Sequence, residues 1–331
     1  MKIKIVAFLS LFFYSIIVNA QDPVFTQYFM VPQVLNPGFT GMLETTNAGI
    51  LHRTQWPDLE LRVDSDFAYA YTWDENINSG FGLNLLSERE TFTDYKFFEG
   101  SLSYAYRVQL TDDWYFRPAA EVGFGYKSYG FQNLVLGDQI NIGSGSINPG
   151  SGDPLLYNNH INFFDISAGM LINNEKGWIG LALKHINKPD ISFEEDGNMP
   201  LDRFFSANLG YEFHIADYVD IISFPYETRL LVTTNYMAQG SYDRLDFGTG
   251  LIFEKYFFGV GAATNPSKDT PGSDFLISVN LFGGLQFNHF KFGYSYDFNT
   301  THIGKTGGVY ELSFMYIFDT SRRCYSCPAY Y

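Results

Sequence analysis

The chain has 331 residues, with 21 Lys and Arg against 36 Asp and Glu, so its formal net charge is −15. This acidity argues against nucleic acid and anionic membrane surfaces as partners, because both attract basic proteins. Hydrophobic residues make up 46% of the chain, which excludes a disordered protein. Aromatic residues reach 18% and charged residues only 17%, whereas soluble domains carry about 25% charged residues. A composition rich in aromatics and poor in charge favours a transmembrane β-barrel.

The chain begins with a segment typical of export. Lys2 and Lys4 precede an apolar run that ends at Val18, and small residues continue to Ala20. This pattern predicts a secretory signal peptide over residues 1–20. The run is shorter than the roughly 20 residues that cross a bilayer as a helix. No later apolar run is long enough for a transmembrane helix, so the mature chain is either a soluble exported protein or a barrel.

Residues 21–45 lack the period of a strand and are rich in Pro and aromatic residues. We expect them to form an N-terminal plug or lid at the periplasmic face of a barrel, because large apolar groups in a free chain end would be left in water. Asn36-Pro37 followed by Gly38 is a turn signal that would let the segment double back. The residues predicted to make this plug are Phe25, Tyr28, Phe29, Asn36, Pro37 and Phe39.

Alternation of apolar and polar residues dominates positions 46–318. Between Lys96 and Leu110, for example, Leu102, Tyr104 and Tyr106 alternate with Ser101, Ser103 and Arg107. Because successive strand residues face opposite sides, each such segment has one apolar and one polar face. About 14 segments have this pattern, which is that of outer-membrane barrel strands. A soluble β-sandwich also alternates, but its strands average about 5–6 residues and are shorter than many of these.

The connector lengths predict the orientation of the barrel. Long connectors such as 128–161 and 186–202 alternate with tight ones such as 173–176 and 254–255. Outer-membrane barrels have long external loops and short periplasmic turns. We therefore expect both termini to be periplasmic, including a tail over residues 319–331. The long connector at 214–226 departs from this alternation.

A barrel of about 14 strands is too wide for its own side chains to fill, so the N-terminal segment or the third loop should occupy the lumen. Charged positions on the polar face are expected to line it. They are Asp64, Asp66, Glu99, Arg107, Arg117, Glu121, Lys127, Arg229, Arg244, Asp246, Lys291, Asp297 and Glu311.

The segment Gln21–Gly41, QDPVFTQYFMVPQVLNPGFTG, resembles the opening of the PorP/SprF family of outer-membrane proteins of Bacteroidota. The matching positions are Pro23, Phe25, Gln27, Tyr28, Asn36, Pro37 and Gly41. The resemblance implies an outer-membrane protein of the type IX secretion and gliding-motility system of a Gram-negative cell. It also implies a role in secreting or anchoring a large surface adhesin through the adhesin's C-terminal domain. A role as the component that links the periplasmic ring of the machine to the outer membrane is the alternative within the family.

No constellation for catalysis is apparent. The six His residues lack metal-ligand spacing, so we expect no enzyme, no cofactor and no metal site. The acidic run Glu194–Asp196 lacks the spaced ligands of a calcium loop and is expected to be a solvated loop tip. Cys324 and Cys327 would form a local disulfide or remain free thiols.

The external loops are where binding residues are expected on a rigid barrel. Exposed aromatic and acidic side chains of the third and fourth loops are the predicted partner-binding residues, namely Phe131, Tyr157, Phe193 and Glu194. The expected partners are the adhesin domain, other secretion or motility components and outer-membrane lipid. A porin-like channel is the alternative function outside the receptor class.

Overall fold

The structure is a computed structural model that describes residues 22–194, 197–215, 228–267, 274–301 and 306–318, together with Cys324 and Pro328. The predicted signal peptide, residues 1–20, lies outside the described residues. So do Glu195, Asp196, Cys327, most of the 214–226 connector and most of the tail at 319–331. No helix within the described ranges is long and apolar enough to cross a membrane.

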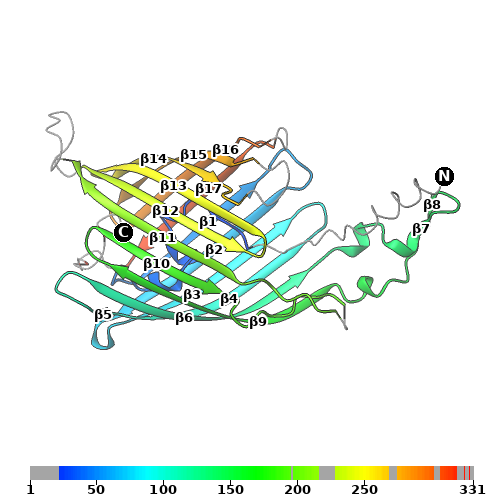
Figure 1. Cartoon of the computed structure of the whole chain (residues 1–331), viewed down its shortest axis with the longest axis horizontal. Helices are drawn as coiled ribbons and strands as arrows, with labels where there is room; N and C mark the ends of the chain where they lie inside the picture. Colours follow the sequence, from blue (N-terminus) through cyan, green and yellow to red (C-terminus); the bar gives the residue numbers. More distant parts are fainter. Residues whose placement is uncertain are drawn as a thin grey trace.

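Fourteen long antiparallel strands form a closed barrel within the described residues, as the sequence predicts (Figure 1). Each strand pairs with its neighbour in sequence, and β1 pairs with β17 to close the ring. The strands are β1 (Asn47–Gln55), β2 (Val63–Asp74), β3 (Ser79–Glu90), β4 (Lys96–Tyr106), β6 (Tyr115–Ser128), β9 (His160–Asn173), β10 (Gly177–Lys184), β11 (Phe204–His214), β12 (Arg229–Gln239), β13 (Tyr242–Phe253), β14 (Tyr256–Thr264), β15 (Leu276–Phe287), β16 (Phe290–Asn299) and β17 (Val309–Ile317).

The two ends of the barrel differ in their connections. One end, which we call the turn end, carries tight connections such as residues 174–176, 254–255 and 288–289. Asn288 adopts a positive φ of 53°, as a two-residue hairpin requires. The other end, the loop end, carries the long connections 129–159 and 185–203. Asn47 pairs with Ile317, so the barrel strands begin and finish at the turn end.

The longest loop projects far beyond the strands at the loop end (Figure 1). It contains three short 3₁₀ turns and the small hairpin of β7 (Ile140–Asn141) and β8 (Ser146–Ile147). At the turn end, β5 (Val108–Gln109) extends the edge of β6.

The outer face of most strands is apolar. Leu102 and Phe124 point outward and are exposed, whereas Ser101 and Ser103 point inward and are buried. The period of two in the sequence therefore becomes an apolar outer band and a polar interior, which is the arrangement that a bilayer requires.

Strand β2 does not follow this apolar-out, polar-in pattern. The prediction that Asp64 and Asp66 line the lumen was wrong. Both face outward at the loop end of β2, where Asp66 Oδ1 lies 2.7 Å from His52 Nδ1 and Asp64 accepts a hydrogen bond from Thr54. The inner face of this strand is aromatic instead, with Phe67, Tyr69, Tyr71 and Trp73 buried. The rings of Phe67, Tyr69 and Tyr71 pack in the core that fills the lumen, so the usual polarity of the two faces is reversed here.

Candidate functional site

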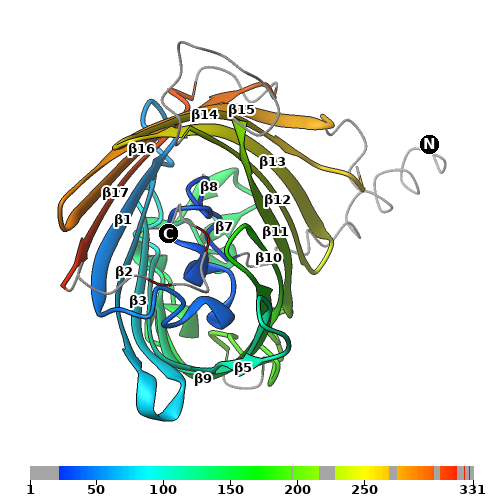
Figure 2. The same cartoon turned by 90° about the vertical axis from the view of Figure 1, so that its left-hand side faces the viewer.

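The N-terminal segment lies inside the ring of strands (Figure 2). Asp22 contacts His185 at the loop end, and Glu44 contacts Arg107 at the turn end, so the segment runs along the lumen from one end to the other. Two short 3₁₀ helices, η2 (Pro32–Val34) and η3 (Pro37–Phe39), keep it compact. Almost all its residues between Phe25 and Leu43 are buried.

The start of the segment is held by the strands that close the barrel. The backbone N–H groups of Thr26 and Gln27 donate to the two carboxylate oxygens of Glu311, at 2.7 and 2.9 Å. Arg53 Nη1 lies 2.6 Å from the same carboxylate, so the positive charge of Arg53 balances the negative charge of Glu311 within the protein interior. Thr26 Oγ1 also donates to Asp297, at 2.6 Å. A buried carboxylate with this many partners fixes the segment in one register.

Aromatic residues of the segment pack against the barrel wall. The Phe29 ring lies 4.3 Å from the Phe282 ring, and the Phe39 ring contacts Trp178 edge-on at 6.3 Å. The Tyr28 hydroxyl lies 3.2 Å from Thr233 Oγ1. The lumen therefore contains an apolar core, in which each large side chain contributes about 1.5–3 kcal/mol on burial.

Asn36 joins the segment to two strands. Its side-chain oxygen accepts from the Gly38 N–H at 2.8 Å, which caps η3, and its amide donates to the Met170 carbonyl at 3.1 Å. A Cβ at Gly169 or Gly180 would lie 2.2 or 2.6 Å from this side chain. Both strands are thus shaped to receive Asn36 from inside the barrel.

Gly41 marks a second close approach of backbones. It has a positive φ of 67°, and a Cβ added there would lie 2.6 Å from Gly80 Cα on β3. Only a residue without a side chain fits both constraints. This explains why the motif that begins at Asn36 ends in glycine.

Both ends of the segment are anchored by charge. At the loop end, the Asp22 carboxylate lies 3.0 Å from His185 Nε2, and Asp165 lies 2.9 Å from His185 Nδ1. Burial alone would lower the pKa of His185, but the two carboxylates outweigh it and raise this pKa to about 10. Burial opposes ionisation of Asp22, yet His185 and Lys184 hold its pKa below the usual range. At the turn end, Glu44 pairs with Arg107 and, at 2.9 Å, with Arg117.

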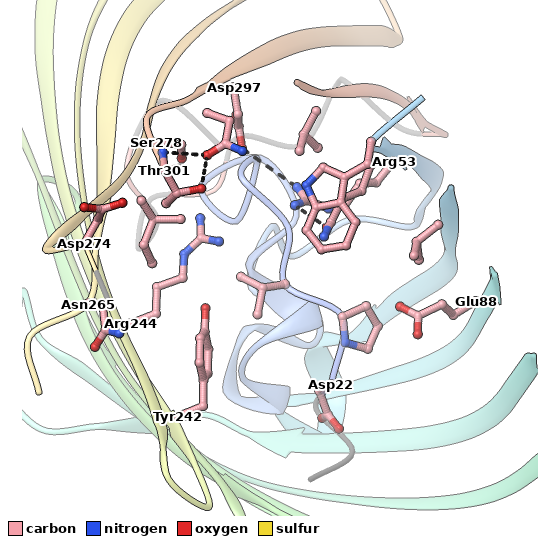
Figure 3. Close-up of a pocket in the computed structure, with 18 residues that line it drawn as sticks. Asp22, Arg53, Glu88, Tyr242, Arg244, Asn265, Asp274, Ser278, Asp297 and Thr301 are labelled. Atoms are coloured by element: carbon pink, nitrogen blue, oxygen red, sulfur yellow. Dashed lines mark hydrogen bonds and ion pairs between the residues drawn. The ribbon is translucent and has the colours of Figure 1, made fainter. Parts of the chain in front are cut away.

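A cavity of about 670 Å³ lies above the segment at the loop end, and we call it the loop-side cavity (Figure 3). Pro23 and Val24 contribute to its lining from the segment, and its walls include Gln55, Val63 and Tyr242, which stand at the loop ends of their strands. Its lining is mixed, with apolar side chains beside charged ones. The charged residues of the lining are Asp22, Arg53, Glu88, Arg244, Asp274 and Asp297.

The predicted partner-binding residues lie on the loop-end surface. Phe131 and Phe193 contact each other edge-on at 5.3 Å, and Tyr129 stacks on Phe131, so the third and fourth loops are joined by an aromatic cluster. Tyr157 is 78% exposed, and Glu194 beside Phe193 is exposed too. None of these residues lines the loop-side cavity. The cavity residues themselves are distant in sequence, and no local pattern identifies them as a group.

The sequence predicted no metal site. For Cys324 and Cys327 it predicted either a local disulfide or free thiols. Within the described ranges, no group of three or more His, Cys, Asp or Glu side chains is arranged to hold a metal ion. Cys324 is disulfide-bonded, and its sulfur lies 3.6 Å from the Met42 carbonyl oxygen at the turn end of the segment. The chain's other cysteine, Cys327, lies outside the described residues.

A closed antiparallel barrel with an apolar outer band and an internal segment defines an outer-membrane β-barrel protein. Residues 17–316 match the sequence model of a family described as type IX secretion system membrane protein PorP/SprF. The chain therefore belongs to the PorP/SprF family and is a protein of the outer membrane. This confirms the resemblance seen in residues 21–41.

Several solved structures are similar to the chain at low identity. CdiB from Acinetobacter baumannii is 8% identical with a TM-score of 0.44, over 83% of this chain and 60% of its own, so this chain spans less than two thirds of CdiB. A Pseudomonas aeruginosa FadL homologue is 9% identical with a TM-score of 0.44, over 86% and 93%. Omp33 of A. baumannii is 8% identical with a TM-score of 0.43, over 83% and 99%. No curated protein sequence matches the chain.

Proposed function

We propose that this chain is a non-enzymatic receptor of the type IX secretion system that holds the C-terminal domain of a secreted adhesin at the cell surface. The loop end would face outward and the turn end the periplasm, as connector lengths favour. The observation that carries the proposal is the filled lumen beneath an open loop-side cavity. A barrel whose interior is packed by its own N-terminal segment offers a binding surface rather than a wide pore.

The third and fourth loops at the loop end supply further contact surface. Ile142 at the tip of the β7–β8 hairpin is 89% exposed, and Ile140, Ile147 and Tyr157 are exposed as well. Isolated apolar side chains on a surface are ordinary, but four on one projecting loop favour a protein partner. The aromatic cluster of Tyr129, Phe131 and Phe193 braces this loop against the fourth loop, so the partner would meet a supported surface.

Co-purification from detergent-solubilised outer membranes tests this proposal. Deleting residues 137–154 or 190–199 should reduce both adhesin display and its recovery with the barrel. The double variant Ile142→Ser and Tyr157→Ser should do so more mildly, and Lys176→Ser at the turn end is the control. Unchanged recovery with both loop deletions would overturn the receptor role at the loop end.

A second candidate is attachment to a periplasmic component at the turn end. Cys324 supports it, because this tail residue packs beside Met42 and brings part of the tail against the end of the segment. Loss of secretion after truncation at residue 319, with adhesin binding retained, would favour this second role.

A further inference from the structure

One cation in the loop-side cavity has hydrogen-bonding capacity left over. The Arg244 guanidinium donates from Nε to Asp246 Oδ1, at 2.7 Å. Within the described part of the chain, neither of its Nη groups makes a hydrogen bond. The Arg244 side chain is 7% exposed, so it is more than nine-tenths buried. Donors of a buried guanidinium that make no bond are costly, because the group has lost water without gaining a partner.

The other arginine of the cavity is occupied. Arg53 donates to Glu311 from Nη1 and to Gln55 from Nη2. Figure 3 shows Arg244 reaching toward the middle of the cavity from the wall that also carries Tyr242. Arg244 is therefore the cation of the cavity lining that has donors to offer to an incoming group.

From this geometry we propose that the loop-side cavity binds the free carboxyl-terminus of a polypeptide, with the carboxylate on the Nη groups of Arg244. A guanidinium presents paired N–H groups whose spacing matches a carboxylate. The inference deepens the proposed function and rests on it for the identity of the polypeptide, which would be the end of the adhesin domain.

The charge of the cavity favours a carboxylate over a phosphate. Asp22, Glu88, Asp274 and Asp297 line it with only two arginines, so a dianionic phosphate would meet about twice the repulsion that a singly charged carboxylate meets. Asp297 Oδ1 is a buried acceptor without a partner among the described residues. A peptide can supply the missing donor from its own N–H group while its carboxylate meets Arg244.

The shape of the cavity favours a chain end over the middle of a chain. Pro23 and Val24 of the N-terminal segment lie beneath it, and it opens among residues at the loop ends of the strands. A cavity floored by the N-terminal segment admits a terminus head-on, whereas an internal stretch would have to enter as a hairpin. The volume of about 670 Å³ suits a few residues, since ligand pockets range over about 300–1,000 Å³. Trp56, Ile277 and Val309 supply apolar contacts for their side chains.

The test uses the full-length barrel in nanodiscs and a pool of N-acetylated tetrapeptides with free carboxyl ends. Peptides retained by the immobilised barrel are counted by mass spectrometry beside the same pool with amidated ends. We expect retention of the free acids at least tenfold above the amides. Equal retention of the two pools, or no retention of either, would overturn the proposal. Decanoate and inorganic phosphate serve as competitors, and displacement of the peptides by either at equal concentration would indicate a general anion site instead.

Variants assign the carboxylate to Arg244. Arg244→Gln with Asp246→Asn removes the pair without leaving one buried charge behind, and should abolish the preference for free acids. Arg244→Lys keeps the positive charge but loses the paired N–H groups of the guanidinium, so it should keep a weaker preference for free acids. Arg62→Gln is the matched control, because it removes one positive charge from the exposed β1–β2 connection outside the cavity lining. A preference that survives the double substitution would refute the assignment.

The same variants separate this inference from the proposed function. If the adhesin domain co-purifies equally with wild type and with the double variant, the receptor role stands and the carboxylate site fails. If the tetrapeptide preference depends on Arg244 but no adhesin co-purifies, the site stands and the receptor role fails.

Discussion

Arg53 on β1 lies directly opposite Glu311 on β17, and their side chains form an ion pair of 2.6 Å at the seam that closes the barrel. The same carboxylate accepts the backbone N–H groups of Thr26 and Gln27. One buried acid therefore joins three parts of the chain, namely the first strand, the last strand and the segment inside the lumen.

Breaking this seam pair should destabilise the barrel strongly. Arg53→Met or Glu311→Leu alone should cost about 3–5 kcal/mol, because each leaves an uncompensated buried charge. The double variant should recover part of that loss. Urea unfolding in lipid vesicles measures the free energy of unfolding of the wild type, the two single variants and the double variant. Arg62→Met is the control, since the exposed Arg62–Asp64 pair is worth about 1 kcal/mol or less. Additive losses in the double variant would show that the pair is not coupled.

The outward face of β4 should not tolerate a charge. Leu102→Arg places a cation in the apolar band and should cost about 2–4 kcal/mol near the midplane. Leu110→Arg is the matched control, since Leu110 is exposed in the connection after β4 at the turn end. Unfolding free energies in bilayers compare the two, and equal costs would contradict the assigned membrane span.

The orientation can be read from two single cysteines in a chain whose Cys324 and Cys327 are replaced by serine. Ser144→Cys at the tip of the third loop should react with a membrane-impermeant maleimide on intact cells. Lys176→Cys in a tight turn at the other end should react only after the outer membrane is opened. The reverse pattern would place the turn end outside.

Removal of residues 23–40 should open an ion path through the lumen, because the segment supplies a large share of the apolar core there. Planar-bilayer conductance should rise well above that of wild type while membrane insertion persists. Deletion of residues 137–154 is the control and should leave conductance unchanged. No rise after the lumen deletion would mean that other parts of the chain seal the barrel.

The anchor at Asp22 should weaken in alkali. His185 has a folded pKa of about 10 against about 6.5 when unfolded, so its contribution is complete below pH 6.5 and is lost as the pH rises through 10. An NMR titration of the imidazole should have its midpoint near 10, and Asp22→Asn should lower it. His185→Gln should flatten the dependence of thermal stability on pH in this window. A wild-type midpoint near 6.5 would contradict the ion pair.

The sequence predicted the strands well because a barrel strand in a bilayer must alternate apolar outward-facing residues with polar inward-facing ones. The alternating stretch between Lys96 and Leu110, for example, contains the strand Lys96–Tyr106. The rule failed on β2, where the apolar N-terminal segment makes the inner face aromatic and turns Asp64 and Asp66 outward. The contacts of His185 were also missed, because Asp22 lies 163 residues away and no local pattern links them. The loop-side cavity was missed for the same reason, since its residues come from segments that lie far apart in the sequence.

The segment inside the barrel imposes an order on assembly. The ring of strands is continuous from β1 round to β17, so once it has closed nothing can join the interior from the side. Either the segment is threaded lengthwise through a finished barrel, or the strands wrap around it before the last pairing forms. The second route needs no passage of bulky rings such as Phe29 and Phe39 through a narrow lumen. On that route, the earliest-made residues of the barrel chain wait for the latest-made strand, and Glu311 reaches both Arg53 and the segment only in the final step.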